Sequence, residues 1–510
     1  MNDVQQTKCL RWLASAILFV GCSLSAPLSA QEQNSAFLDG VSVYDTTELL
    51  VFAAHLSAVD DGRVDIRELA AAIERIYVED GYFLAHAFVE EDGSTITVHE
   101  GSIRSVEIVN SDPSTYNLIR QYFEPLIGRS AITIDEFERA VLLSDDLETV
   151  AVTAELSQQE GHGADVRIVT TQEDDRRGWV TIDNPAREFG DAVTVSINQE
   201  FYEAVTAGDM LRISITHTLG FDPDDAQTIG SITYRTPLGG SGAYLEGSFS
   251  NSAATHDAFG ALPETHRDGR TGMLAFGFPV VRTVDRYAYF LLEGRASSSD
   301  LSFGGTTNEE ELASVSASWI DGRALSSGGA LEFAVSVTAG SQTIMPSGVD
   351  NGDEDYTVLR AGFDAEVPLL DFSYTTLRLD MTMQVSPDRL PHAEEFFLGG
   401  REQLRGYRFA EAQGDTGIAA SLSIGRDFIP SGGDLQRVRP FGFIDMGYVE
   451  NNAPGLAEIA DQALFSMGIG VEAQFNSYYF IRGHLGFPMV DGVTQTTRDP
   501  AIYLGITRSW

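Results

Sequence analysis

The chain has 510 residues, of which 75 are Asp or Glu and 33 are Lys or Arg, so its formal net charge at pH 7 is −42. Nucleic acid is excluded as a partner because binding it requires clustered cations that so acidic a chain lacks. The length is too great for one small domain and indicates two to four units, or small modules followed by one large barrel.

Residues 1–30 have the pattern of a secretory signal peptide. Lys8 and Arg11 precede an apolar run at 12–20, and Ala30 provides a cleavage site. The run is too short to span a bilayer. Both cysteines lie inside this segment, so the mature chain would rely on no disulfide. A short linker, 31–36, follows.

Residues 37–101 predict a small α+β module with the order strand, helix, helix, strand, strand. The first strand is VSVYD (41–45), and Asp45 and Glu48 have the spacing of a capping box for the first helix. Apolar residues spaced three and four apart predict a second helix from Asp65, which ends at Gly81. YFLAHAFV and STITVHEG, joined by a turn, form a hairpin.

Residues 102–172 repeat this order. SVEIV is a strand, Asp112-Pro113 opens a helix, Thr133 and Glu136 form a capping box, and TVAVTAEL pairs with ADVRIVT. Both segments resemble the polypeptide-transport-associated (POTRA) domain, the first most closely in GYFLAHAFVEEDGSTITVHEG. The alternative is two periplasmic α+β domains of unrelated role. The spacing of His86, His99 and His162 does not indicate a metal site.

From residue 175 to 510 the sequence predicts strands without helices. In TLRLDMTMQV, the side chains of Leu377, Leu379, Met381, Met383 and Val385 alternate with those of Arg378, Asp380, Thr382 and Gln384. A soluble sandwich shows the same alternation with its apolar face inward. The many charges on the opposite face and the lack of an 18-residue apolar run favour a transmembrane antiparallel β-barrel.

The chain ends in a strand, AIYLGITRSW, with four apolar side chains on one face, interrupted by Arg508: Ile502, Leu504, Ile506 and Trp510. Outer-membrane barrels commonly close with such a strand and a terminal aromatic residue. We therefore expect an assembly signal here, read by the outer-membrane barrel assembly machinery.

A glycine-rich stretch, LGGREQLRGYRFAEAQGD (398–415), carries a central cation, Arg405. Glycine lets such a loop turn tightly and pack closely against a wall. About thirty residues later, FGFIDMGY (441–448) places Asp445 in a strand. A buried arginine needs a carboxylate that its planar fork can grip, so we predict that Arg405 pairs with Asp445.

These two motifs resemble the outer-membrane translocation and assembly superfamily, and specifically the transporters of two-partner secretion of the haemolysin secretion/activation type. The resemblance rests on the LRGY residues Leu404, Arg405, Gly406 and Tyr407, and on the FxDxG residues Phe443, Asp445 and Gly447. It implies a sixteen-stranded barrel in the outer membrane, with the loop folded back inside, and two modules in the periplasm. The implied partner is a secreted exoprotein with an amino-terminal secretion domain.

Two other functions remain open at this point. A barrel insertase also has an LRGY loop, but such relatives usually carry three or more POTRA modules. A passive porin or adhesin with a periplasmic anchor is an alternative of another class. Transporters of the family often begin with a plug helix, for which residues 31–36 leave little room. Either the plug is absent or the loop carrying Arg405 closes the pore alone.

The sequence has no phosphate-binding glycine loop, HExxH or GxSxG motif, so we expect no enzyme, no metal and no cofactor. Two acidic clusters do not have the ligand spacing of a calcium loop and are interpreted as solvated extracellular loops. They consist of Asp222, Asp224 and Asp225, and of Asp350, Asp353, Glu354 and Asp355.

Overall fold

The computed structural model describes residues 37–57, 65–158, 163–184, 192–220, 226–256, 265–345, 352–369, 374–455 and 458–510. The signal peptide and linker expected at 1–36 lie outside these residues, as do His162, Asp222, Asp224, Asp225 and Asp350. The chain forms two compact units, and the second comprises Asp80–Leu84 and Gly101–Trp510.

The first module has the predicted order of elements. These are β1 (Phe37–Asp39), α2 (Thr46–Leu56), α3 (Ile66–Glu79), β2 (His86–Val89) and β3 (Thr95–His99). The sheet order is β1-β3-β2, with β2 and β3 as the predicted hairpin. Helix α3 buries Leu69, Ile73 and Ile76, which is the apolar stripe expected from the sequence.

The prediction of a strand at 41–45 is wrong, because β1 lies at Phe37–Asp39. The segment instead bends over the buried carboxylate of Glu100. The backbone N–H groups of Ser42 and Val43 donate to Glu100 Oε1 at 2.6 and 2.9 Å, and the Tyr77 hydroxyl donates at 2.7 Å. A buried carboxylate needs such donors, and they fix the segment outside the sheet.

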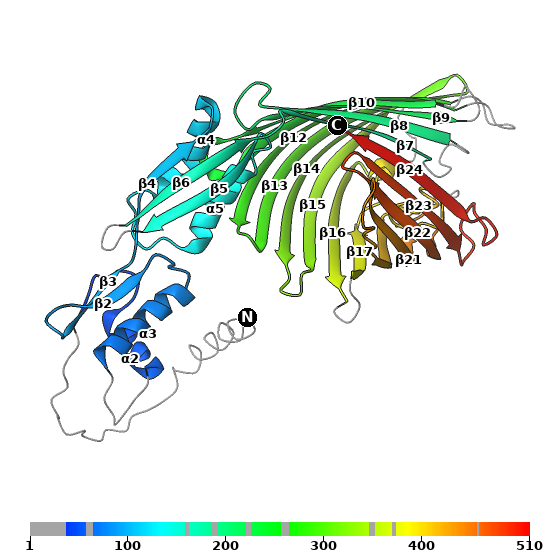
Figure 1. Ribbon diagram of the computed structural model, residues 1–510. Coiled ribbons are helices and arrows are strands. Elements are labelled where there is room, and N and C mark those ends of the chain that lie inside the picture. Colours follow the sequence, from blue (N-terminus) through cyan, green and yellow to red (C-terminus); the bar gives the residue numbers. More distant parts are fainter. Residues whose placement is uncertain are drawn as a thin grey trace, which may run out of the picture. The chain divides into compact units, whose positions relative to one another are not determined.

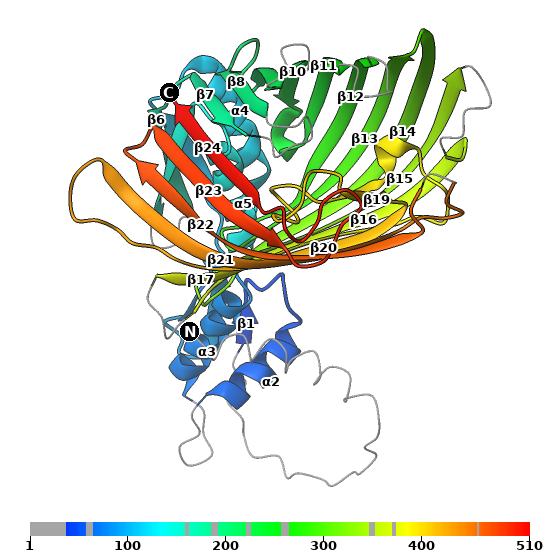
Figure 2. The ribbon, with the colours of Figure 1, turned by 90° about the vertical axis from the view of Figure 1, so that its right-hand side faces the viewer.

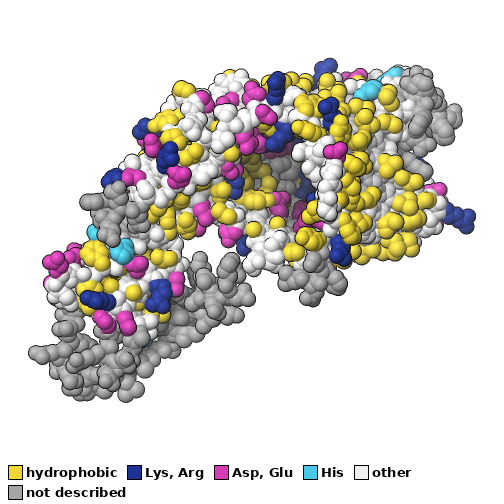
Figure 3. Space-filling model, in the orientation of Figure 1, with side chains coloured by type: hydrophobic (Ala, Val, Ile, Leu, Met, Phe, Trp, Pro, Cys, Tyr) yellow, Lys and Arg dark blue, Asp and Glu magenta, His cyan; other side chains and the backbone are white. Residues whose placement is uncertain are grey.

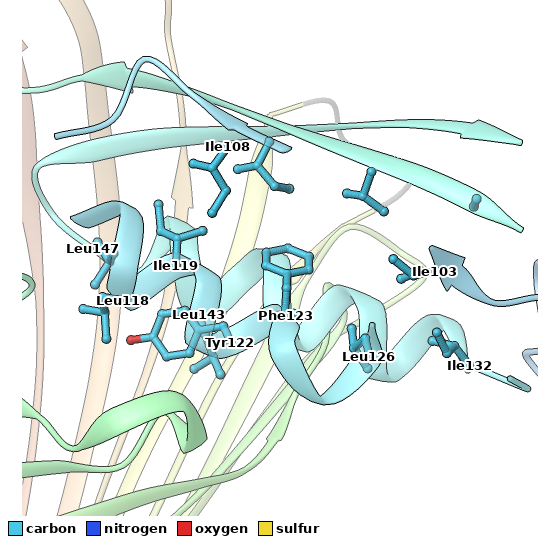
Figure 4. Packing of buried hydrophobic residues seen from close by; sticks show 14 of the residues in the cluster. Ile103, Ile108, Leu118, Ile119, Tyr122, Phe123, Leu126, Ile132, Leu143 and Leu147 are labelled. Carbon is cyan, nitrogen blue, oxygen red and sulfur yellow. The ribbon is translucent and has the colours of Figure 1, made fainter. Parts of the chain in front are cut away.

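The second module consists of β4 (Ile103–Val109), α4 (Pro113–Phe123), the 3-10 helix η1 (Glu124–Leu126), α5 (Ile134–Asp145), β5 (Val150–Gln158) and β6 (Ala164–Gln172). Asp112 caps α4, and both hydrogen bonds of the Thr133–Glu136 capping box are present. The helices and the β4-β6-β5 sheet share one apolar core, to which α4 contributes the fully buried Ile119 and Phe123 and α5 contributes Leu143 (Figure 4).

Sixteen strands, each antiparallel to its two neighbours, close into a barrel (Figures 1 and 2). They are β7 (Arg176–Asp183), β8 (Ala192–Tyr202), β9 (Met210–Gly220), β10 (Ala226–Pro237), β11 (Tyr244–His256), β12 (Thr265–Arg282), β13 (Arg286–Phe303), β14 (Thr306–Ala324), β15 (Ala330–Met345), β16 (Asp355–Pro368), β17 (Thr375–Val385), β20 (Thr416–Arg426), β21 (Leu435–Glu450), β22 (Asp461–Phe475), β23 (Tyr479–Pro488) and β24 (Ala501–Ser509). In the described part of the chain, no helix has the length and apolar character needed to cross a bilayer.

The barrel wall is apolar outside and polar inside. On β17, Met381 and Met383 are exposed on the outer face, whereas Gln384 is only 2% exposed and donates to carbonyl oxygens inside the barrel. Figure 3 shows hydrophobic side chains gathered over the outer wall. Closure satisfies the backbone hydrogen-bonding groups of every strand, and the outward apolar side chains form a band suited to contact with lipid.

The second module contacts the barrel at connections that all lie at one end. Arg282 grips Asp146 with two hydrogen bonds of 2.6 and 3.0 Å, the Val284 N–H donates to Glu138 at 3.0 Å, and Glu203 accepts from Thr115 at 2.6 Å. Because the strands alternate in direction, the β17–β20 and β23–β24 connections lie at the opposite end.

Candidate functional site

The β17–β20 connection, residues 386–415, folds back into the barrel, and we call it the inner loop. It contains the 3-10 helix η3 (His392–Glu394) and a short hairpin of β18 (Phe396–Leu398) and β19 (Ala412–Gly414). It lies within the curve of the barrel wall in Figure 2. Gly399 and Gly400 have φ values of +116° and +101°, which side-chained residues rarely adopt, so the chain can turn here.

Arg405 and Asp445 are in contact at the buried tip of the inner loop. Arg405 Nη2 donates to Asp445 Oδ1 at 2.6 Å, and both its Nε and its backbone N–H donate to Oδ2 at 3.0 and 2.9 Å. Arg405 is 5% exposed and Asp445 is 0% exposed. The pair is therefore bidentate and shielded from bulk solvent, a geometry that favours strong charge-assisted hydrogen bonds.

Two neighbours complete what we call the Arg405 lock, namely Arg405, Asp445, Ser421 and Phe443. Arg405 Nη2 also donates to Ser421 Oγ at 2.6 Å, and the guanidinium carbon lies 3.7 Å from the centre of the Phe443 ring. The aromatic face adds a cation–π attraction, and the hydroxyl satisfies a further donor.

The other LRGY residues fasten the loop around this lock. Leu404 and Tyr407 are fully buried in one apolar cluster. The Tyr407 hydroxyl lies 2.7 Å from the Val490 carbonyl oxygen, and the Tyr407 carbonyl accepts from the Tyr503 hydroxyl at 2.8 Å. The loop is thereby attached to β24 and to the β23–β24 connection.

The motif glycines make room for the loop. A Cβ on Gly406 would lie 2.5 Å from Ser466 Cβ, and one on Gly447 would lie 2.2 Å from Leu398 Cδ1. A side chain at Gly447 would force the fully buried Leu398 side chain to shift, so the glycine of FxDxG provides the surface on which the inner loop rests.

Sequence reasoning missed three buried polar residues of this site. Asp415, 1% exposed, accepts from the backbone N–H groups of Leu390 and Asn452 at 2.6 and 2.7 Å. Glu411 and Gln495 are 4% and 1% exposed. Asp415 belongs to the GD of the loop pattern, which was a usable signal, but Glu411 and Gln495 look like ordinary surface residues in the sequence.

The inner loop is bound on one side of the lumen and leaves space on the other. A cavity of about 840 Å³ separates it from the wall of β14–β17. The cavity lining includes Ser336, Gly362 and Thr382 of the wall, and Phe409 of the loop, which is 44% exposed.

The carboxyl-terminal residues close the barrel. Ile502, Leu504, Ile506 and Trp510 are all at least 40% exposed and alternate with inward-facing side chains. Trp510 exchanges two backbone hydrogen bonds with Gly178, and its Nε1 donates to Gln199 at 3.2 Å. The terminal aromatic residue thus lies on the first strand, β7.

The described residues contain no group of three or more His, Cys, Asp or Glu side chains that could hold a metal ion. His86 lies 2.7 Å from Glu74, and His99 stacks on Phe88. Of the second acidic cluster, Asp353 accepts a hydrogen bond from the Arg389 N–H at 2.9 Å.

The comparison with known protein families identifies the chain. The model described as haemolysin secretion/activation protein ShlB/FhaC/HecB matches residues 162–473. The chain belongs to this family. It is therefore an outer-membrane transporter for protein secretion.

Solved structures show the same fold. CdiB from Escherichia coli has a TM-score of 0.77 at 17% identity, over 99% of this chain and 98% of that chain. CdiB from Acinetobacter baumannii has a TM-score of 0.73 at 13% identity, over 100% of this chain and 97% of that one. A search of the curated proteins found no match.

Proposed function

We propose that this transporter captures an unfolded partner exoprotein in the periplasm with its POTRA modules and exports it through the barrel. In the resting state, the inner loop occupies the route and is held by the Arg405 lock. The observation that carries this proposal is the buried, bidentate contact between Arg405 and Asp445 inside the lumen. A loop fixed there narrows the lumen to the cavity beside it, and we expect the loop to move before an extended chain passes.

Client capture would use the edges of the module sheets. In the β4-β6-β5 sheet, β5 and β4 each have one strand neighbour, and in the β1-β3-β2 sheet the same holds for β1 and β2. An extended peptide can add a strand to such an edge through main-chain hydrogen bonds, which requires little sequence specificity. The partner class that fits is an unfolded exoprotein with an amino-terminal secretion domain.

Movement through the barrel would be driven from outside. Neither ATP nor a membrane potential is available at the outer membrane, so folding of the emerging client at the surface supplies the direction. The transporter needs no catalytic residue and no cofactor for this task. The carboxyl-terminal strand with Trp510 would serve earlier, as the signal that the barrel assembly machinery reads.

Deletion of residues 37–172 tests client capture. The variant is expected to form a heat-modifiable barrel, because closure depends on strand pairing, but to lose binding of the exoprotein's secretion domain. Binding is measured on purified full-length and deleted proteins in detergent. Undiminished binding by the barrel alone would refute the role of the modules. Single-channel recordings of the full-length protein provide a second check, since a passive porin would be permanently open.

A further inference from the structure

The inner loop makes a second buried polar contact that lies outside the LRGY motif. Glu411 Oε1 accepts hydrogen bonds from the backbone N–H groups of Thr494 at 2.6 Å and Gln495 at 2.8 Å, and Oε2 accepts from the Thr494 hydroxyl at 2.8 Å. Thr494 and Gln495 belong to residues 489–500, which join β23 to β24 and which we call the surface segment.

Gln495 binds the inner loop in the reverse direction. Its Nε2 donates to the carbonyl oxygens of Gly406 at 2.8 Å and Asp499 at 2.6 Å, and its Oε1 accepts from the Arg408 N–H at 3.0 Å. Gly406 directly follows Arg405. The contact therefore reaches the residue beside the lock and joins the inner loop to the surface segment at that point.

Burial makes these contacts expensive to break. Glu411 is 4% exposed and Gln495 is 1% exposed, so separating them leaves polar groups without partners until water enters. Gly492 packs against the same carboxylate, since a Cβ there would lie 2.3 Å from Glu411 Oε1. Three residues of the surface segment, Gly492, Thr494 and Gln495, therefore contact the Glu411 carboxylate.

We propose that Glu411 and Gln495 are positioning residues, which hold the surface segment on the inner loop and thereby keep Arg405 on Asp445 in the resting transporter. The inference rests on the proposed role of the inner loop in closing the pore. The surface segment lies at the end of the barrel opposite the second module, which faces the cell surface when the modules capture the client in the periplasm. A conformational change in the surface segment would consequently alter the contact between Arg405 and Asp445 through Glu411 and Gln495.

The hydrogen-bond geometry predicts which substitutions are tolerated. Both backbone N–H groups donate to the same oxygen, Glu411 Oε1, and the Thr494 hydroxyl can either donate or accept. Glu411→Gln therefore retains all three contacts, whereas Glu411→Ala removes them. Gln495→Ala removes the two donors on which the Gly406 and Asp499 carbonyl oxygens depend.

The test measures whether the inner loop stays seated, with a single reporter cysteine. Ala419 is 3% exposed in the apolar cluster that contains Leu404, and the sequence holds only two cysteines, both before residue 31. Ala419→Cys should react with a water-soluble maleimide only when the loop leaves. Labelling rates are compared in outer-membrane fractions that contain heat-modifiable barrel.

We expect Glu411→Ala and Gln495→Ala each to raise the labelling rate about tenfold or more, as loss of hydrogen bonds to buried or charged groups predicts. Glu411→Gln should stay within about twofold of the parent. Val493→Ala is the matched control, because Val493 lies in the same segment with its side chain 50% exposed.

Three results would overturn the inference: unchanged labelling in both alanine variants, equal labelling in Glu411→Gln and Glu411→Ala, or loss of the heat-modifiable barrel in both alanine variants. The last counts because the contacts lie outside the strand pairing of the wall. Rapid labelling of Ala419→Cys without any second substitution would instead refute the resting position of the inner loop, and with it that part of the proposed function.

Discussion

At the residue scale, the loop site combines a charged pair with glycines that allow close approach. Arg405 of the inner loop contacts Asp445, Ser421 and Phe443 of the barrel wall. Gly447 allows these contacts, because without a side chain it lets the inner loop lie close to β21. Removing one partner of a buried ion pair costs roughly 3–5 kcal/mol, since the remaining charge stays buried. The Arg405–Asp445 ion pair is therefore costly to break by removing one charge. It also depends on the packing of the inner loop, which can be changed while both charges remain.

Gly447→Ala should displace the inner loop while both charges remain. The new methyl group would meet Leu398 Cδ1 at 2.2 Å, an overpacking that costs about 1–3 kcal/mol. We expect more frequent channel openings in single-channel recordings. Gly442→Ala, on the same strand, is the control because the nearest atom to its Cβ is 3.9 Å away. Equal gating of the two variants would argue against the packing role of Gly447.

Glu100 should give the first module a dependence on pH. Burial raises the pKa of Glu100, but hydrogen bonds from Ser42, Tyr77 and Val43 outweigh it, so the net pKa lies below the ordinary value. A lowered pKa stabilises the folded module above the unfolded-state pKa of about 4.3, and this contribution is lost as the pH falls through the folded-state pKa.

Glu100→Ala should accordingly lower the free energy of unfolding of the first module by about 1–3 kcal/mol at pH 7. The variant should also lose less stability than the wild type as the pH falls. Hydrogen exchange of the Ser42 and Val43 amides, measured in the full-length protein between about pH 6 and pH 3, reports both effects. Unchanged protection of these two amides in the variant would contradict the role of Glu100.

The sequence allowed an ion pair between two charged motif residues to be predicted. It did not reveal polar side chains whose partners are backbone groups far away in the chain. Arg405 and Asp445 could be paired because a buried arginine at the centre of a glycine-rich loop needs a carboxylate. Glu411 and Gln495 carried no comparable signal, since each binds mainly backbone groups that are 83 to 89 residues away. Glu100 was missed because its backbone partners, Ser42 and Val43, are also far away in the sequence, and residues 41–45 were wrongly predicted to form a strand.

At the element scale, the strands of the barrel could be predicted because each has one lipid face and one wet face. The period of two shows this directly, as on β17. What the sequence could not provide was the register between strands and the short hairpin inside the inner loop. Register depends on cross-strand partners such as Asp445 opposite Ser421, which no local pattern contains.

Met381→Arg and Thr382→Arg test the facing of β17. Met381 is 37% exposed on the outer wall, so an arginine near the bilayer midplane should cost about 2–4 kcal/mol and reduce insertion. Thr382 lines the lumenal cavity, where a charge is solvated, and its substitution should change only conductance. The measurement is the amount of heat-modifiable protein in outer-membrane fractions. Equal insertion of both variants, or the reverse order, would contradict this facing.

At the scale of the whole molecule, the second module and the barrel form one unit, joined by Arg282 and Asp146 among other contacts. The sequence indicated the modules and the barrel but not these contacts, because surface residues of both parts have no distinguishing pattern. The second module contacts one end of the barrel, and the inner loop and the surface segment connect strands at the other end.

Secretion by an Arg405→Ala transporter tests the account most directly. The partner exoprotein is measured in the medium and in the periplasm of cells that carry wild-type transporter, Arg405→Ala, or Arg401→Ala as the control. Arg401 is on the same loop, but its ion pair with Asp183 is partly exposed and contributes little. We predict heat-modifiable barrel in all three, with secretion lost only in Arg405→Ala. Wild-type levels of exoprotein in the medium of Arg405→Ala cells would contradict the central role of the lock.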